Sequence, residues 1–223
     1  MTEEQRKTFW EIIEIFDKTE LLPYVMVIGS WAEYLYQNYH IPEFKQGLKS
    51  SDVDIFYYNI RKPVGREIMI SKAMEEKGFI YTENRLSGVG KYIKEGILEV
   101  EFLTRALAQG DVVNKIPSLK ISASGIKEIN ILEKFPLKLK CKDFIITVPE
   151  PEAYVLQKIL INPKRKTEEK REKDMMSIQE LWKLIDKDRV NEVFKYFTRK
   201  QQNIIIEVCT KYTLDVSFNK QKV

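Results

Sequence analysis

The chain has very few of the residues on which several common kinds of catalytic site depend. It contains one histidine, His40, and two cysteines, Cys141 and Cys209, among 223 residues. A single histidine excludes zinc sites built from several histidines and disfavours a Ser-His-Asp triad. The cysteines are far apart in sequence and have neither metal-ligand nor disulfide-scaffold spacing, so we expect both to be reduced. This scarcity favours chemistry based on carboxylates.

Long apolar runs and export signals are also missing. No apolar run reaches the roughly 18 residues that a membrane span needs, and the charged segment Met1–Arg6 lacks a signal-peptide core. We therefore expect a cytoplasmic protein with no membrane partner. The net charge of +4 is spread among interleaved acids and bases, which disfavours a nucleic-acid-binding arm and gives weak support for a polyanionic ligand.

The first informative pattern is an apolar run that ends in Gly29-Ser30. Residues 25–28 predict a buried strand, and apolar residues recur every four positions from Trp31, which predicts a helix. A Gly-Ser turn at a helix N-terminus presents backbone N–H groups, a hydroxyl and the positive end of the helix dipole. Gly29 and Ser30 are therefore candidate phosphate ligands. The alternative is a plain tight turn with Ser30 as the N-cap.

Two aspartates interrupt the next apolar run, over residues 52–58. Side chains at positions i and i+2 of a strand point to the same side, so Asp52 and Asp54 are expected to project together. Two like charges side by side are unfavourable unless a positive group lies between them. A divalent cation with oxygen ligands, Mg²⁺ above all or Mn²⁺ in its place, would supply that charge. The alternative is a solvent-facing row of a half-buried strand.

A third acidic position is predicted on a later strand, residues 97–104. Glu99 and Glu101 share one side of it, and Val100 lies on the other. If this strand pairs beside the aspartate strand, three or four carboxylates converge. Such a cluster suits two-metal phosphoryl or nucleotidyl transfer, with Glu101, or Glu99 in its place, as the third ligand or the base. A solvated strand face is the alternative for the glutamates.

The remaining pattern predicts an α+β fold with two domains. The mixed sheet with its flanking helices is expected over residues 1–148, and helices alone over 149–223, with the change at Pro149-Glu150-Pro151. Residues 105–135 are predicted to be irregular, with short strands at 119–122 and 127–131. Lys45 and Lys49, in the loop before the aspartates, are further candidates to meet a triphosphate, although solvated lysines are the simpler interpretation.

The strand, the Gly29-Ser30 turn, the helix, Asp52-Val53-Asp54 and the later Glu101 together resemble the nucleotidyltransferase superfamily of the polymerase-β type. The likeness covers most of residues 20–185 and is nearest to uncharacterised prokaryotic nucleotidyltransferase-like proteins close to the AbiEii-type toxins. Two further stretches also look like theirs, 148–158 and Lys173-Asp174.

The resemblance implies a nucleotidyltransferase fold with a helical C-terminal lobe that forms the other wall of the cleft. It implies a Mg²⁺-dependent enzyme that moves a nucleoside monophosphate from an NTP to an acceptor hydroxyl and releases pyrophosphate. Asp52, Asp54 and Glu101 would be the catalytic and metal-binding residues, and Gly29, Ser30 and Lys158 would bind the nucleotide.

The sequence departs from the family pattern in two places. Ser30 and Asp52 are separated by a longer segment than in compact members, and the third acid is a glutamate where aspartate is commoner. The acceptor, whether a small molecule, a tRNA or a protein, has no signature in the sequence. Two alternatives stay open: a toxin-like enzyme held inactive by an antitoxin protein, and a non-catalytic protein that retains the fold.

Overall fold

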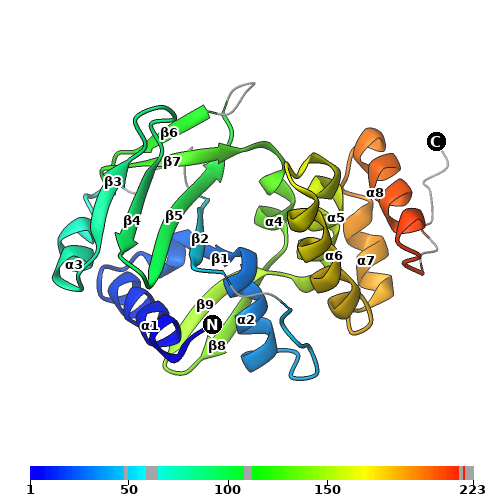
Figure 1. Ribbon diagram of the computed structural model, residues 1–223, viewed down its shortest axis with the longest axis horizontal. Helices are drawn as coiled ribbons and strands as arrows, with labels where there is room; N and C mark the ends of the chain where they lie inside the picture. Colours follow the sequence, from blue (N-terminus) through cyan, green and yellow to red (C-terminus); the bar gives the residue numbers. More distant parts are fainter. Residues whose placement is uncertain (48–49, 59–64, 108–111, 216–217, 219–223) are drawn as a thin grey trace.

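The structure is a computed structural model that describes residues 1–47, 50–58, 65–107, 112–215 and 218. A mixed sheet with its covering helices forms one part of the molecule, and a group of helices that follows it in sequence forms the other (Figure 1). Lys49, one of the predicted loop lysines, lies outside the described residues. Among those described, no helix is both long and apolar enough to cross a membrane.

The main sheet contains both parallel and antiparallel strand pairs. Its strands are β1 (Val25–Ile28), β2 (Asp52–Tyr57), β3 (Ile80–Glu83), β4 (Gly90–Lys94), β5 (Leu98–Arg105), β6 (Val112–Ile116) and β7 (Ile121–Ile126). Five strands follow the order β1-β2-β5-β4-β3. β7 pairs with the C-terminal end of β5, and β6 pairs with β7. β2 and β5 are parallel, while β1 pairs with β2 and β4 with β5 antiparallel. The short turn at Gly96, which has a φ of +72°, closes the β4–β5 hairpin.

Helix α1 (Glu3–Lys18) packs on one face of this sheet, and the acidic residues project from the other. The other helices of the sheet-containing part are α2 (Gly29–Tyr39), α3 (Ile70–Glu76) and the short α4 (Asn130–Lys134). α1 starts at a capping box between Thr2 and Gln5. Its buried Phe16 packs against Phe102 of β5. Since side chains alternate along a strand, Glu99 and Glu101 point to the opposite face.

The segment 105–135 is more regular than predicted. It contains the β6–β7 hairpin, the 3₁₀ turn Lys127–Ile129 and α4, so the strand expected at 127–131 is wrong. The apolar residues there have the spacing of a short helix as well as of a strand, and such short runs are ambiguous in sequence. Figure 1 shows β6 and β7 running across the upper ends of the other strands.

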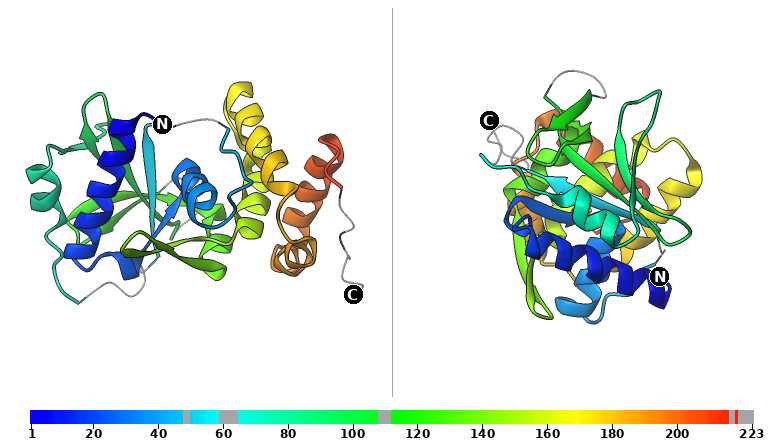
Figure 2. Two further views of the ribbon diagram at one scale, coloured as in Figure 1. Left: turned by 90° about the horizontal axis from the view of Figure 1, so that it is seen from below. Right: turned by 90° about the vertical axis from the view of Figure 1, so that its left-hand side faces the viewer.

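A second hairpin and a group of helices complete the chain. β8 (Pro136–Cys141) and β9 (Phe144–Pro149) form a separate two-stranded sheet, and β9 lies beside β1. The helices are α5 (Pro151–Ile161), α6 (Glu168–Trp182), α7 (Lys187–Phe194) and α8 (Arg199–Lys211). α5 contacts the other three helices and α4, and the left-hand view of Figure 2 shows the group set to one end of the molecule. Division into domains 1–148 and 149–223 stays a prediction.

A substitution at Gly90, the first residue of β4, can test how closely Tyr81 of β3 packs against this strand. A Cβ at this position would lie 2.0 Å from the Tyr81 hydroxyl oxygen. We therefore expect Gly90→Ala to destabilise the protein by about 1–3 kcal/mol through overpacking. Gly47→Ala is the matched control, because a Cβ there meets nothing within 4 Å. Urea unfolding of both variants measures the difference, and equal stabilities would contradict the packing at Tyr81.

Candidate active site

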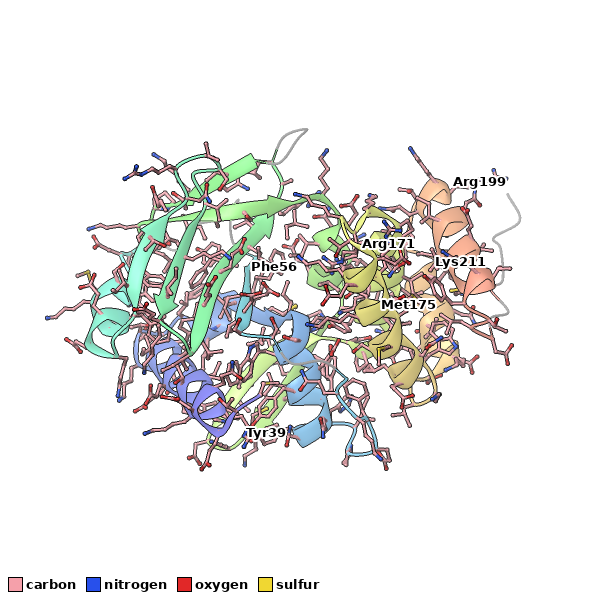
Figure 3. The ribbon with its side chains drawn as sticks, viewed as in Figure 1. Tyr39, Phe56, Arg171, Met175, Arg199 and Lys211 are labelled. Atoms are coloured by element: carbon pink, nitrogen blue, oxygen red, sulfur yellow. The ribbon has the colours of Figure 1, made fainter. Side chains whose placement is uncertain are left out.

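The parallel pairing of β2 with β5 brings the predicted acidic residues together. In this register Asp52 is opposite Glu99, and Asp54 is opposite Glu101. Directly opposed residues on neighbouring strands share a face of the sheet, so all four carboxylates project from the face that α1 does not cover. Phe56 follows on the same face of β2 and is fully buried (Figure 3), which closes one end of the row.

Asp54 lies against the backbone of the turn that joins β1 to α2. A Cβ on Gly29 would lie 2.4 Å from Asp54 Oδ2, and Gly29 has a φ of +65°. Only glycine meets both demands, because a side chain would collide with the carboxylate and strain the backbone. Gly29 is therefore required here for the close approach of the turn to the aspartate.

The surroundings of Asp54 disfavour its charged form. Burial, followed by the charges of Glu101 and Asp52, raises the pKa of Asp54 to about 7. Lys158 and Lys91 act in the opposite direction and offset only part of this effect. The site therefore concentrates negative charge at a place where an added cation would be stabilised.

Lys91 of β4 supplies positive charge at the edge of the acidic row. Its Nζ lies 3.3 Å from Glu99 Oε2 and 3.3 Å from Glu101 Oε2. Although partial burial opposes the charged ammonium, the carboxylates of Glu101 and Glu99 raise the pKa of Lys91 above its ordinary value. Lys91 therefore holds the two glutamates at one side of the row, away from the two aspartates.

The carboxylates of the acidic row are of the kind that binds a hard divalent cation, but they do not form a closed ligand set. Within the residues that the structure describes, no three Asp, Glu, His or Cys side chains form a metal-ligand cluster. Asp52 and Asp54 offer carboxylate oxygens on one face, and burial together with the charges of Glu101 and Asp52 raises the pKa of Asp54, so a cation would be favoured there. Glu101 is held by Lys91 instead.

The predicted phosphate-binding turn has the expected place in the fold. α2 begins at Gly29 with Ile28 as its N-cap, so the alternative in which Ser30 is the N-cap is wrong. The Ser30 Oγ atom is buried and has no hydrogen-bond partner among the described residues. A buried hydroxyl without a partner is costly, and a ligand oxygen at the start of α2 would satisfy it.

Lys158 of α5 belongs to a buried polar network that joins the helical group to this turn. Its Nζ lies 2.8 Å from Asp174 Oδ1 on α6 and 3.3 Å from Glu33 Oε1 on α2. Burial opposes its charge, but Glu33 and Asp174 together raise the pKa of Lys158 above the ordinary value. Arg165 also reaches the network, with its Nε 2.6 Å from Asp174 Oδ2.

Tyr154 connects the same network to Gly29. Its hydroxyl lies 2.7 Å from Glu33 Oε1 and 3.0 Å from the Gly29 carbonyl oxygen. Burial and the charge of Glu33 raise the pKa of Tyr154 well above its ordinary value, so the hydroxyl keeps its proton for these acceptors. The backbone of the turn is thus held from the helical group.

Sequence reasoning missed Lys91, Glu33, Tyr154 and Arg165 as parts of this site. Lys91 is one of many lysines in the chain, and only the pairing of β4 with β5 places it beside Glu101. Glu33 carried a usable signal, because an acid in the apolar pattern of a helix has to find a buried partner. That partner, Lys158, is distant in sequence.

Comparisons with known proteins show the family and the fold of the chain. A family model described as "Nucleotidyltransferase" matches residues 8–202. The antibiotic-resistance factor ANT(2'')-Ia aligns in structure with a TM-score of 0.56 and 12% identity, over 95% of this chain and 100% of the other. An antigenic nucleotidyltransferase-like protein from Paracoccidioides brasiliensis gives 0.52 and 12%, over 90% and 88%. The search of curated proteins found no match. These structures show that the fold is the predicted one.

The raised pKa of Asp54 predicts how stability depends on pH without added metal. Because the folded pKa of about 7 exceeds the ordinary value of 3.8, folding loses stability as the pH rises between these values. We expect Asp54→Asn to raise the free energy of unfolding at pH 8, on the order of 2–4 kcal/mol, and by much less at pH 5. Urea unfolding in EDTA measures this, with exposed Asp143→Asn as the control. A gain that is the same at both pH values would contradict the assignment.

Proposed function

Because the chain belongs to the nucleotidyltransferase family, we propose that it transfers a nucleoside monophosphate from an NTP to an acceptor hydroxyl. The observation that carries this proposal is the position of Asp54, which touches the Gly29 turn and faces Glu101 across the β2–β5 ladder. The proposed phosphate-binding turn, the aspartate pair and a further carboxylate thus lie around one point of the sheet, which supports the proposal.

The proposed reaction is an in-line displacement at the α-phosphorus of the NTP. The acceptor oxygen forms a bond to this phosphorus, and the bond to the pyrophosphate oxygen breaks. The proton of the acceptor hydroxyl passes to the Glu101 carboxylate, which is the candidate base, with Glu99 as the alternative. The products are the nucleoside monophosphate ester of the acceptor and pyrophosphate.

Asp52, Asp54 and Glu101 are the proposed metal ligands. Bound Mg²⁺, or Mn²⁺, would neutralise the phosphate oxygens and lower the pKa of the acceptor hydroxyl, with a second ion clamping the leaving group. For Glu101 to join the aspartates, its carboxylate has to leave the ammonium of Lys91, 3.3 Å away. Lys91 therefore competes with the metal for this glutamate.

The nucleotide's phosphates are proposed to lie at the start of α2. The Gly29 turn and the unpartnered Ser30 hydroxyl face them, and the helix dipole favours their charge. Lys158 contributes positive charge from α5, and its electrostatic effect on Asp54 supports this placement. The helices over 149–223 would then form the second wall of the site and a domain separate from residues 1–148.

The first test is calorimetric binding of ATP with and without Mg²⁺. We expect Mg²⁺-dependent binding to the wild-type protein and at least a tenfold loss in Asp52→Asn/Asp54→Asn, because both proposed metal ligands lose their charge. The Asp143→Asn variant is the control for a remote carboxylate. Labelled ATP added to a cell extract would then reveal an acceptor, and Asp54→Asn should abolish that labelling.

Two outcomes would contradict the proposal. ATP binding that is independent of both Mg²⁺ and the aspartates would remove the metal assignment. Absence of ATP binding by a folded wild-type protein would favour a non-catalytic protein that retains the fold. Growth arrest on expression that disappears with Asp52→Ala would instead identify the toxin-like form of the same chemistry.

Lys91 provides a second prediction about the metal site. Replacing Lys91 removes the ammonium that pairs with Glu101 and so takes one positive charge away from the acidic row. We expect Lys91→Met to bind Mn²⁺ severalfold more tightly than the wild type, as measured by electron paramagnetic resonance titration. Lys94→Met is the matched control, because Lys94 lies on the same strand but pairs with Glu11 of α1. Unchanged Mn²⁺ affinity in Lys91→Met would show that the ammonium does not compete with the metal.

A further inference from the structure

Beside Glu101, the strand that pairs with one edge of β5 changes from β4 to β7. β4 pairs with β5 from Leu98 to Glu101, and β7 takes over the same edge from Leu103 to Arg105. Figure 1 shows β4 continuing toward β3 while β7 crosses the upper end of β5. The two strands thus separate at Glu101, and the side chains at the division project on the acidic face.

Two adjoining hollows lie in this division, and together they are called the groove here. They have volumes of about 520 Å³ and about 410 Å³, and Ser87, Val89, Glu101 and Ser124 line both. Volumes of this size suit a small molecule. Because Glu101 lines both hollows, a ligand in the groove would lie directly against the candidate base.

The two hollows differ in chemistry. Beyond the shared residues, the first is lined by four polar residues, Thr82, Glu83, Asn84 and Lys91, and by one apolar residue, Ile93. The second has an apolar wall made of Leu86, Leu103, Val113 and Ile126. Leu86 is fully exposed at the lip of the groove, where an unpartnered leucine is unfavourable in water.

The walls of the groove are held in place without a ligand. In the β3–β4 turn, the Asn84 side-chain oxygen accepts hydrogen bonds from the backbone N–H groups of Leu86 and Ser87, both at 2.9 Å. The Tyr81 hydroxyl accepts from the Ser122 N–H of β7 at 2.9 Å and donates to Glu83 at 3.0 Å. The turn and β7 are therefore fixed relative to each other, which favours a preformed site.

We propose that this groove is the acceptor site and that its ligand is a hydroxyl-bearing amphiphile without negative charge. The polar hollow takes a hydroxylated head group, the apolar hollow takes an alkyl or similar arm, and the reacting hydroxyl lies at Glu101 between them. Charge disfavours an anionic head, because Glu83 and Glu101 line the groove and the one ammonium among its described lining residues, that of Lys91, is shared between Glu101 and Glu99.

The identity of the groove as the acceptor site rests on the proposed function, whereas ligand binding to it does not. In the transfer step the hydroxyl oxygen of the amphiphile bonds to the α-phosphorus, pyrophosphate leaves, and Glu101 takes the proton. The aspartate pair lies across β5 from the groove on the same face. Nucleotide and acceptor would therefore approach the point of reaction from opposite edges of β5.

The test uses n-octyl-β-D-glucoside below its micelle concentration, with methyl-β-D-glucoside as the head group without an arm. Saturation-transfer NMR on the full chain measures the binding of each. We expect octyl glucoside to bind at least about tenfold more tightly than methyl glucoside, because its arm covers the apolar wall. We expect Leu86→Lys/Val89→Lys to lose at least tenfold of this affinity, and exposed Leu184→Lys on the helical group to lose none.

Binding of MgATP to the same variants separates the two proposals. The groove variant should bind MgATP within twofold of the wild type, which also shows that it is folded, and mass spectrometry should find nucleotidylated octyl glucoside with the wild type only. Equal affinities for the two glucosides, or unchanged affinity in Leu86→Lys/Val89→Lys, would overturn the groove assignment while MgATP binding stands. Groove binding as expected without any MgATP binding would support the groove and overturn the proposed function.

Discussion

The register between β2 and β5 is the constraint on which the rest of the site depends. These parallel strands place Asp54 beside Glu101 and Asp52 beside Glu99. A slip by one residue would turn the acids toward α1 and the apolar side chains toward solvent. The burial of Val53, Val100 and Phe102, the last of which packs against Phe16 of α1, therefore fixes the register. The apolar core thus determines where the carboxylates meet, although none of them contributes to it.

Placing these carboxylates close together costs free energy, and the nearby positive charges offset only part of that cost. Lys91 acts from β4 and Lys158 from α5, yet the pKa of Asp54 stays raised to about 7. Such perturbed carboxyl groups cluster at functional sites, because the same repulsion that destabilises the empty site strengthens cation binding. The position of Lys91 between two glutamates also explains why the carboxylates do not form a closed ligand set.

The network around Lys158 links the two parts of the molecule at the site. Tyr154 of α5 contacts the Gly29 carbonyl, and Lys158 bridges Glu33 of α2 to Asp174 of α6. Removing one partner from a buried ionic network leaves an uncompensated charge, which is strongly destabilising. The position of the turn and the packing of the helical group are therefore expected to depend on each other, and a change in either would reach Asp54 through Gly29.

The sequence by itself determined the local parts of this arrangement. The strand before Gly29, the helix after it, the alternation around Asp54 and that around Glu101 depend on residues a few positions apart, so their periodicity predicts them. Only the tertiary structure decided that Lys91 pairs with Glu101, that Tyr154 reaches Gly29, and that β7 replaces β4 on the edge of β5. These contacts join residues distant in the chain, and their geometry follows from strand order and packing, which have no short-range signature.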